Sequence, residues 1–419
     1  MSDTYVKFRN EVLAGGATDR DGQQETAGGP RAVLAALGIV ALLVLLGWWS
    51  PWALLFVVGL LLSIFLHELG HFTTAKLTGM KVTQFFLFMG PKLFSFRRGE
   101  TEYGLRLLPL GAYVRIIGMN NLDEVDPADE DRAYRTKSYP RRLLVITAGS
   151  LMHMLIAVAL LFGVYAVQGQ RTQTGRVGLA SIVKGYPAEV AGLQAGDIIA
   201  SVDGVTPRSA SQLTALIRAH APGDVVSVVA DRDGTQVVKQ VTLGTNPDDP
   251  KSNIGFLGIS SASEVGWKSM STPSAALHSV TDLGHAMWAS VGGVITVLNP
   301  VNIYQHVTGA NNDPNTQPST VVGISRLSAT IGQESGLGGI LLVLAGVNVF
   351  VGLLNLFPLL PFDGGHAAIA TYKRLRSRKG RPAYRADVAK MIPVTMAVMV
   401  LLAFLVFAGL YLDYAKPPG

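Results

Sequence analysis

The chain has 419 residues, of which 49% are hydrophobic and 15% are charged. Soluble domains carry about 25% charged residues, so this deficit and several long apolar runs indicate a membrane protein. Cysteine is absent, which excludes disulfide bonds and thiolate metal sites, so any metal must be bound by His, Asp or Glu. The net charge of +6 is modest, and no basic stretch interleaved with aromatic residues predicts a nucleic-acid partner.

The chain begins with a polar segment followed by two apolar runs. Residues 1–31 are rich in Gly, Asp, Gln and Thr and are expected to form a disordered cytoplasmic tail. Residues 32–49 are long enough to form an extra N-terminal transmembrane helix, and the WWSPW sequence that follows is typical of a membrane interface. Ser50 can cap the next helix, and Pro51 suits its first position. A tight hairpin of two spans is therefore predicted.

The second span carries an H-E-x-x-H motif at residues 67–71. Positions i and i+4 lie on one face of a helix, so His67 and His71 can bind one zinc ion while Glu68 stands beside the water that it activates. An idle acidic residue at mid-membrane costs about 2.5–3.5 kcal/mol, which favours a functional site. His67 follows Pro51 by about 24 Å at 1.5 Å rise per residue, so the metal is expected in the far leaflet.

Residues 72–142 form a loop rich in lysine and arginine, which the positive-inside rule places in the cytoplasm. Strand-like stretches lie within this loop at residues 82–88, 92–96 and 103–117. Because they are apolar for a loop, they are expected to form a β-element associated with the membrane beside the metal. A third span at residues 143–167 completes the first part of a catalytic membrane core, residues 50–167.

Residues 172–262 are polar and rich in turns, with short apolar strands, which indicates one soluble α+β domain outside the cytoplasm. The expected elements are strands at 177–184, 197–202, 225–231 and 236–243, and a helix at 210–219. Residues 263–336 are expected to form an amphipathic linker region, with a helix at 275–298 that lies on the outer leaflet and is not counted as a span.

Residues 337–412 are predicted to be the second part of the membrane core, with spans at 337–360 and 391–412. The first of these ends in NLFPLLPFDGGH, residues 355–366. Two prolines three residues apart cannot lie inside a regular helix, so the backbone is expected to open there and to line a cavity. The basic segment at 373–385 lies on the same side as the first cation-rich loop in this five-span arrangement.

A hydrolytic zinc site needs a third protein ligand, and Asp363 is the predicted one because it lies at a matching depth. His366 is its rival. Glu68 is the predicted general base. Asn355 either hydrogen-bonds an extended substrate or satisfies the broken helix itself. A substrate helix must unwind before hydrolysis, and the β-element is expected to bind it as an added strand.

The combination of HELGH at 67–71 and NLFPLLPFDGGH at 355–366 resembles the site-2 protease family of intramembrane zinc metalloproteases. The similarity is greatest to the bacterial branch with an extracytoplasmic PDZ domain, particularly its actinobacterial members. The resemblance implies these site residues: zinc ligands His67, His71 and Asp363, catalytic Glu68, and substrate-contacting Asn355. It also implies single-pass transmembrane substrates, namely anti-sigma factors already trimmed by another protease.

The segment YPAEVAGLQAGDII, residues 186–199, with Val-Asp-Gly at 202–204, resembles a PDZ domain of bacterial proteases. The family implies that this domain excludes intact substrates by size, and it leaves peptide binding open. Two departures stand out: Gly-Ser-Leu-Met-His at 149–153 replaces the usual Gly-Pro-x-x-Asn, and the 32–49 span is additional. His153 is either a packed, hydrogen-bonded histidine or a participant in the chemistry.

The sequence therefore predicts a polytopic α-helical membrane protein of about five transmembrane helices with a membrane-associated β-element and an extracytoplasmic α+β PDZ domain. It is expected to be a zinc endopeptidase of the plasma membrane, with its active site toward the cytoplasmic leaflet. A catalytically inactive PDZ-bearing scaffold is the alternative and predicts a degenerate metal motif. A zinc-dependent transporter would need ionisable residues along a path, and the spans outside the site have few.

Overall fold

The computed structural model describes residues 29–119, 123–247, 249, 253–311, 313, 316–377 and 391–415. The chain divides into two compact units, Met1–Tyr165 with Thr272–Gly419, and Ala166–Ser271. We describe each unit by itself. The predicted tail at 1–31 lies outside the described residues except for its last three positions, and so does much of the basic segment at 373–385.

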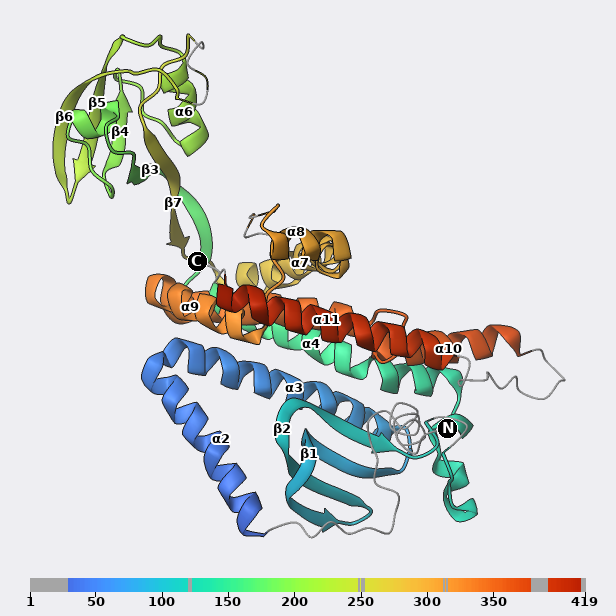
Figure 1. Ribbon diagram of the computed structural model, residues 1–419. Coiled ribbons are helices and arrows are strands. Elements are labelled where there is room, and N and C mark those ends of the chain that lie inside the picture. Colours follow the sequence, from blue (N-terminus) through green and yellow to red (C-terminus); the bar gives the residue numbers. More distant parts are fainter. Residues whose placement is uncertain are drawn as a thin grey trace. The chain divides into compact units, whose positions relative to one another are not determined.

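The first unit is built from long apolar helices (Figure 1). Within the described residues, five helices are long and apolar enough to cross a membrane. They are α2 (Pro30–Trp49), α3 (Pro51–Leu77), α4 (Tyr139–Val167), α9 (Val321–Asn355) and α11 (Ile392–Ala415). This confirms the predicted polytopic helical membrane protein. Helices α7 (Thr272–Leu298) and α8 (Pro300–Thr308) form a bent pair that adds a sixth candidate span.

The turn between α2 and α3 forms as predicted, and the two helices diverge from it in a V (Figure 1). Ser50 is the N-cap of α3, and its hydroxyl accepts a hydrogen bond from the backbone N–H of Ala53 at 3.2 Å. Pro51 occupies the first helical position, where its missing N–H costs nothing. The apolar 18-residue stretch of α2 has no buried residue, as expected for a helix that faces lipid.

Strands β1 (Val82–Arg98) and β2 (Thr101–Ile116) form an antiparallel hairpin that curves alongside α3 (Figure 1). The sequence predicted two strands before residue 97, but β1 is continuous, with its register shifted between Met89 and Lys92. The register is the same on both sides of this irregularity, as the pairs Phe85–Val114 and Phe96–Tyr103 show, so it interrupts the pairing locally without ending the strand. Phe85 anchors the hairpin on α3, since its ring lies 5.8 Å from that of Phe65 and 5.3 Å from that of Phe72.

Glu100, in the tight turn of this hairpin, joins three parts of the first unit. Arg132 donates two hydrogen bonds to its carboxylate at 2.7 and 2.8 Å, and Lys76 near the end of α3 pairs with the same group. These hydrogen bonds, that of Arg132 above all, lower the pKa of Glu100 to about 2. The cluster fixes the hairpin turn against α3 and the short 3₁₀ helix η1 (Pro127–Arg132).

Asp413, near the end of α11, ties the last span to the start of α9. Its buried carboxylate accepts hydrogen bonds from the backbone N–H groups of Thr320 and Gly323 at 2.9 and 3.0 Å, and from the hydroxyls of Ser319 and Thr320. It therefore satisfies backbone donors that the first turn of any helix leaves free. Helix α9 has a non-helical residue at Gly336 (φ 62°), directly before the predicted start of the span.

The second unit is an α+β domain with a five-stranded sheet among its described residues, in the order β6-β5-β4-β3-β7. The strands are β3 (Gln170–Ile182), β4 (Ile198–Val202), β5 (Val225–Arg232), β6 (Thr235–Thr242) and β7 (Ile259–Lys268), with helices α5 (Pro187–Val190) and α6 (Ala210–Arg218). Arg232 donates two hydrogen bonds to the buried Asp197 and thereby lowers the pKa of that carboxyl. Strand β7 was not predicted, because its residues ISSASEVGWK lack a clean apolar alternation.

The Glu100 cluster makes the stability of the first unit depend on pH. Because the folded pKa of Glu100 is about 2 against about 4.3 for a free Glu, its stabilisation is fully present above pH 4.5 and is lost as the pH falls toward 2. We expect Glu100→Gln to lower the free energy of unfolding by about 1 kcal/mol at pH 7, because the ion pairs are partly exposed. Thermal unfolding of the detergent-solubilised protein at pH 7 and pH 2.5 measures this difference.

Glu124→Gln is the matched control, because Glu124 is an exposed carboxylate in the same cation-rich loop. It should leave the unfolding temperature unchanged at both pH values. An equal loss of stability for Glu100→Gln at pH 7 and at pH 2.5 would contradict the role given to the ionised carboxylate.

Candidate active site

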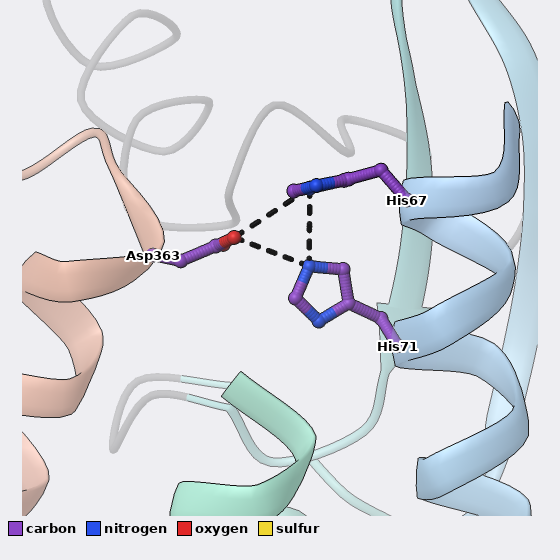
Figure 2. Close-up of side chains that lie close together, drawn as sticks. All are labelled: His67, His71 and Asp363. Atoms are coloured by element: carbon purple, nitrogen blue, oxygen red, sulfur yellow. Dashed lines mark hydrogen bonds and ion pairs between the residues drawn. The ribbon is translucent and has the colours of Figure 1, made fainter. Parts of the chain in front are cut away.

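Helix α3 carries two buried histidines that face the same point. His67 and His71 lie one turn apart, and their Nε2 atoms are 3.2 Å from each other (Figure 2). A hydrogen bond between two neutral imidazoles at these atoms would require one of them to carry its proton on Nε2. The surroundings of His71 decide which nitrogen is protonated.

The Nδ1 atom of His71 lies 2.7 Å from the main-chain carbonyl oxygen of Val145 on α4. A carbonyl only accepts hydrogen bonds, so His71 Nδ1 carries the proton and donates it. In the neutral ring, Nε2 then has a free lone pair directed at the site. Metal-binding histidines commonly have this arrangement, in which a bond from the other ring nitrogen fixes the orientation of the ring.

Asp363 lies far from the two histidines in the sequence, after helix α9. Helix α9 ends at Asn355, within the span predicted to reach Leu360, and α10 (Asp363–Arg376) begins after a turn that contains both prolines. Proline cannot supply the N–H that a continuing helix needs, so the helix ends before Pro358 and the backbone opens within residues 355–366, as predicted. Asp363 lies in the first turn of α10, where the helix dipole favours a negative charge.

The glycine after Asp363 lets this turn fold tightly. A Cβ atom at Gly364 would collide with the main-chain carbonyl oxygen of Leu356, so only glycine allows the end of α9 to lie against the first turn of α10. The close packing directs the Asp363 carboxylate toward the histidine pair (Figure 2). Its Oδ2 atom is 3.2 Å from His71 Nε2 and 3.5 Å from His67 Nε2.

These three atoms have the spacing of zinc ligands. A tetrahedral ion with bonds of about 2.0–2.1 Å holds its ligand atoms about 3.3 Å apart. The three separations here are 3.2, 3.2 and 3.5 Å. Asp363 Oδ2 is also buried with no hydrogen-bond partner among the described residues. Within the described residues, His67, His71 and Asp363 form the group of His and acidic side chains that could hold a metal ion.

Helix α4 lies against the edges of the two imidazole rings that carry the Nε2 atoms. A Cβ atom on Gly149 would collide with the imidazole rings of both His67 and His71, so the α4 backbone lies directly over the pair. This close approach explains why the Gly-Ser-Leu-Met-His segment, which differs from the usual family motif, begins with glycine. Farther along α4, the ring of His153 lies 4.9 Å from that of His67, centroid to centroid.

The other predicted residues lie around this group. Glu68 is half-buried and near enough to His71 and Asp363 for electrostatic interaction with both. Asn355 is the last residue of α9 and is half-buried. His366, the rival ligand, lies on α10 and interacts electrostatically with Asp363, but it is not part of the metal-binding group among the described residues. The roles of Glu68 and Asn355 stay predictions.

Two contributions were missed from the sequence, namely those of Val145 and Gly149. Val145 acts through its main-chain carbonyl, so its side chain carries no signal of the role. Gly149 was noted as part of a motif, but its closeness to both histidines follows from the packing of α4 on α3 and not from any local rule.

Comparison with known proteins agrees with this geometry. Residues 55–402 match peptidase family M50. The chain belongs to this family. It is 30% identical over 397 residues to the zinc metalloprotease Rip1 of Mycobacterium tuberculosis (strain H37Rv), covering 87% of this chain and 97% of the relative. Rip1 of Mycolicibacterium smegmatis shows 30% identity over 405 residues, with the same coverage of both chains.

A more distant relative is the zinc metalloprotease RasP of Shouchella clausii, 25% identical over 405 residues, which cover 76% of this chain and 89% of that protein. The M50 match confirms the predicted site-2 protease family, the zinc cofactor and the metalloprotease activity. It disfavours the inactive scaffold, since the metal-binding group is complete in the described residues.

The constraint that α4 places on His67 and His71 can be tested by measuring zinc binding. We expect Gly149→Ala to weaken zinc binding about tenfold or more, because the added methyl group must displace His67 or His71. Zinc affinity of the full chain in detergent, measured by competition with a chelator, gives the change.

Gly163→Ala is the matched control on the same helix, since a Cβ atom at Gly163 meets no atom within 4 Å. Alanine is favoured over glycine in a helix by about 1 kcal/mol, so this variant should keep its zinc and be slightly more stable. Equal zinc affinities in the two variants would show that α4 does not constrain the histidines.

Proposed function

We propose that this zinc metalloprotease is an intramembrane endopeptidase that cleaves transmembrane segments of single-pass membrane proteins. The proposed site residues are zinc ligands His67, His71 and Asp363, general base Glu68 and substrate-binding Asn355. The observation that supports the proposal most is the convergence of three ligand atoms, two from an apolar span and one from the first turn of the helix that follows another span.

In the proposed mechanism, bound zinc supplies a Lewis acid that makes a water molecule acidic and polarises the peptide carbonyl. His71 keeps its orientation through its bond to the Val145 carbonyl. Glu68 takes a proton from the attacking water and passes it to the nitrogen of the leaving amine as the peptide bond breaks. Asn355 presents an amide that can hydrogen-bond the main chain of an unwound substrate, next to the turn that carries Asp363.

The β1–β2 hairpin is the proposed docking surface for the unwound segment. It is a two-stranded sheet in the described residues, and a substrate strand can extend such a sheet through main-chain hydrogen bonds. Phe94 and Phe96 on β1 are 59% and 51% exposed, which suits an apolar substrate. Its packing on α3, the helix that carries the histidines, supports delivery of the substrate to the site.

The proposed topology follows from the positive-inside rule. The cations of the loop between α3 and α4 support a cytoplasmic position for that loop, and with it an active site toward the cytoplasmic leaflet of the plasma membrane. The second unit is then extracytoplasmic.

We further propose that the second unit is a PDZ domain. Its sheet of antiparallel strands with two short helices supports this assignment. Its proposed role is to exclude substrates whose external domains are intact, and binding of a peptide in its groove would add to that selection. Anti-sigma factors trimmed by another protease are the substrate class we propose.

Glu68→Gln tests the mechanism. The amide cannot accept a proton, so we expect the variant to lose more than 99% of cleavage while it retains one zinc ion per chain. Cleavage of a single-pass membrane protein with its external domain removed, and metal analysis of the same sample, give both values. Cleavage at the wild-type rate would rule out Glu68 as the general base.

Asp363→Ala tests the third ligand. We expect zinc to fall well below one ion per chain, because two histidines alone bind it weakly. His366→Ala is the control and should keep its zinc, since His366 lies on the same helix outside the metal-binding group of the described residues. The reverse result for the two variants would make His366 the ligand.

A further inference from the structure

The three spans around the metal site are joined by a chain of buried polar side chains that the proposed mechanism does not use. Ser63 on α3, Asn348 on α9 and His153 on α4 are 3%, 1% and 2% exposed. Asn348 contacts both of the others, since its Oδ1 lies 2.8 Å from His153 Nδ1 and its Nδ2 lies 3.1 Å from Ser63 Oγ. Burying a polar side chain in an apolar span costs free energy, so three connected polar side chains indicate a structural or functional role.

The direction of every hydrogen bond in this chain follows from main-chain carbonyls. Ser63 donates its hydroxyl proton to the Gly59 carbonyl at 2.9 Å, so its oxygen accepts from Asn348. Asn348 Nδ2 also donates to the Leu344 carbonyl at 2.8 Å, which uses both amide protons. Asn348 Oδ1 must therefore accept from His153, whose Nδ1 carries the proton. His153 is held in one tautomer and one ring orientation.

His153 lies at the end of a row of residues on α4 that contact the two histidines. Val145, Gly149 and His153 follow one another at intervals of four residues and so share one face of the helix. Val145 bonds His71, Gly149 lies against both rings, and His153 lies against His67. The backbone of α9 at Gly352 also packs against His153, since a Cβ atom there would lie 2.9 Å from the Cβ atom of His153.

The two zinc-ligand candidates differ in how their rings are held. His71 has a hydrogen bond from Nδ1 to the Val145 carbonyl. His67 Nδ1 is buried with no hydrogen-bond partner among the described residues. The α4 backbone at Gly149 lies against the opposite edge of this ring, and the His153 ring packs on it at 4.9 Å between centroids.

We propose that His153 is a positioning residue for the zinc ligand His67, and that Asn348, oriented by Ser63 and the Leu344 carbonyl, holds His153 in place. This inference rests on the proposed function, in which His67 binds zinc. Packing by a fixed imidazole replaces for His67 the hydrogen bond that fixes His71. Ordering the ligand before zinc arrives raises the affinity of the site, as supporting residues around metal ligands commonly do.

The test uses His153→Leu, Asn348→Leu and the double variant in the full chain, solubilised in detergent. Each single variant leaves a buried polar group without its partner, so we expect lower thermal stability and about tenfold weaker zinc binding. The double variant removes both partners, so its stability should return close to that of the wild type. Its zinc affinity should stay about tenfold reduced, and the visible spectrum of its cobalt(II) form should differ from that of the wild type.

A purely structural role predicts the opposite for the double variant, namely zinc affinity that recovers together with stability. That result, or wild-type zinc affinity in all three variants, would overturn the inference. Thr395→Val is the control, because it removes a buried hydroxyl on α11 that donates to the main-chain carbonyl of Met391, directly before that helix, and to no other span among the described residues. It should change neither the affinity nor the spectrum.

His67→Ala separates this inference from the proposed function. If His67→Ala keeps wild-type zinc affinity, the ligand assignment fails, and the positioning role fails with it. If His67→Ala loses zinc while the double variant binds it as the wild type does, only the positioning role of His153 fails.

Discussion

The close contact between α3 and α4 is the constraint on which the metal site depends. Gly149 lets the α4 backbone reach the imidazoles of His67 and His71, and this approach brings the Val145 carbonyl within hydrogen-bonding distance of His71. A larger side chain at position 149 would separate the helices and remove that bond at the same time. The histidine spacing on α3 creates the possibility of a metal site, and α4 supplies its geometry.

Sequence rules predicted the parts of the site that depend on local geometry. The spacing of His67 and His71 and the helix-breaking effect of proline before Asp363 are properties of short segments, so both could be found in advance. The opening of the backbone after Asn355 falls in the segment where it was predicted, because proline cannot continue the hydrogen-bonding pattern of a helix. The Val145 contact depends on helix packing and had no sequence signal.

Three buried polar side chains of the first unit lie where spans meet. Ser63, His153 and Asn348 join three spans, and the hydroxyl and amide donors of this set are paired with acceptors. In an apolar environment a paired polar group specifies one arrangement of helices, because any rotation of a helix leaves that group unpaired. The same residues that could tune the metal site thus also fix the register of the helices around it.

The capping of α9 by Asp413 makes the order of synthesis matter. The carboxylate that satisfies the first turn of α9 lies on α11, about ninety residues later in the chain. While α9 leaves the ribosome, its exposed donors therefore lack their final partner, and they obtain it only after the last span has been inserted. The segment that leads to Asp363 lies between these two helices. The last described span thus stabilises the start of the helix that leads to Asp363, although the two partners lie about ninety residues apart in the chain.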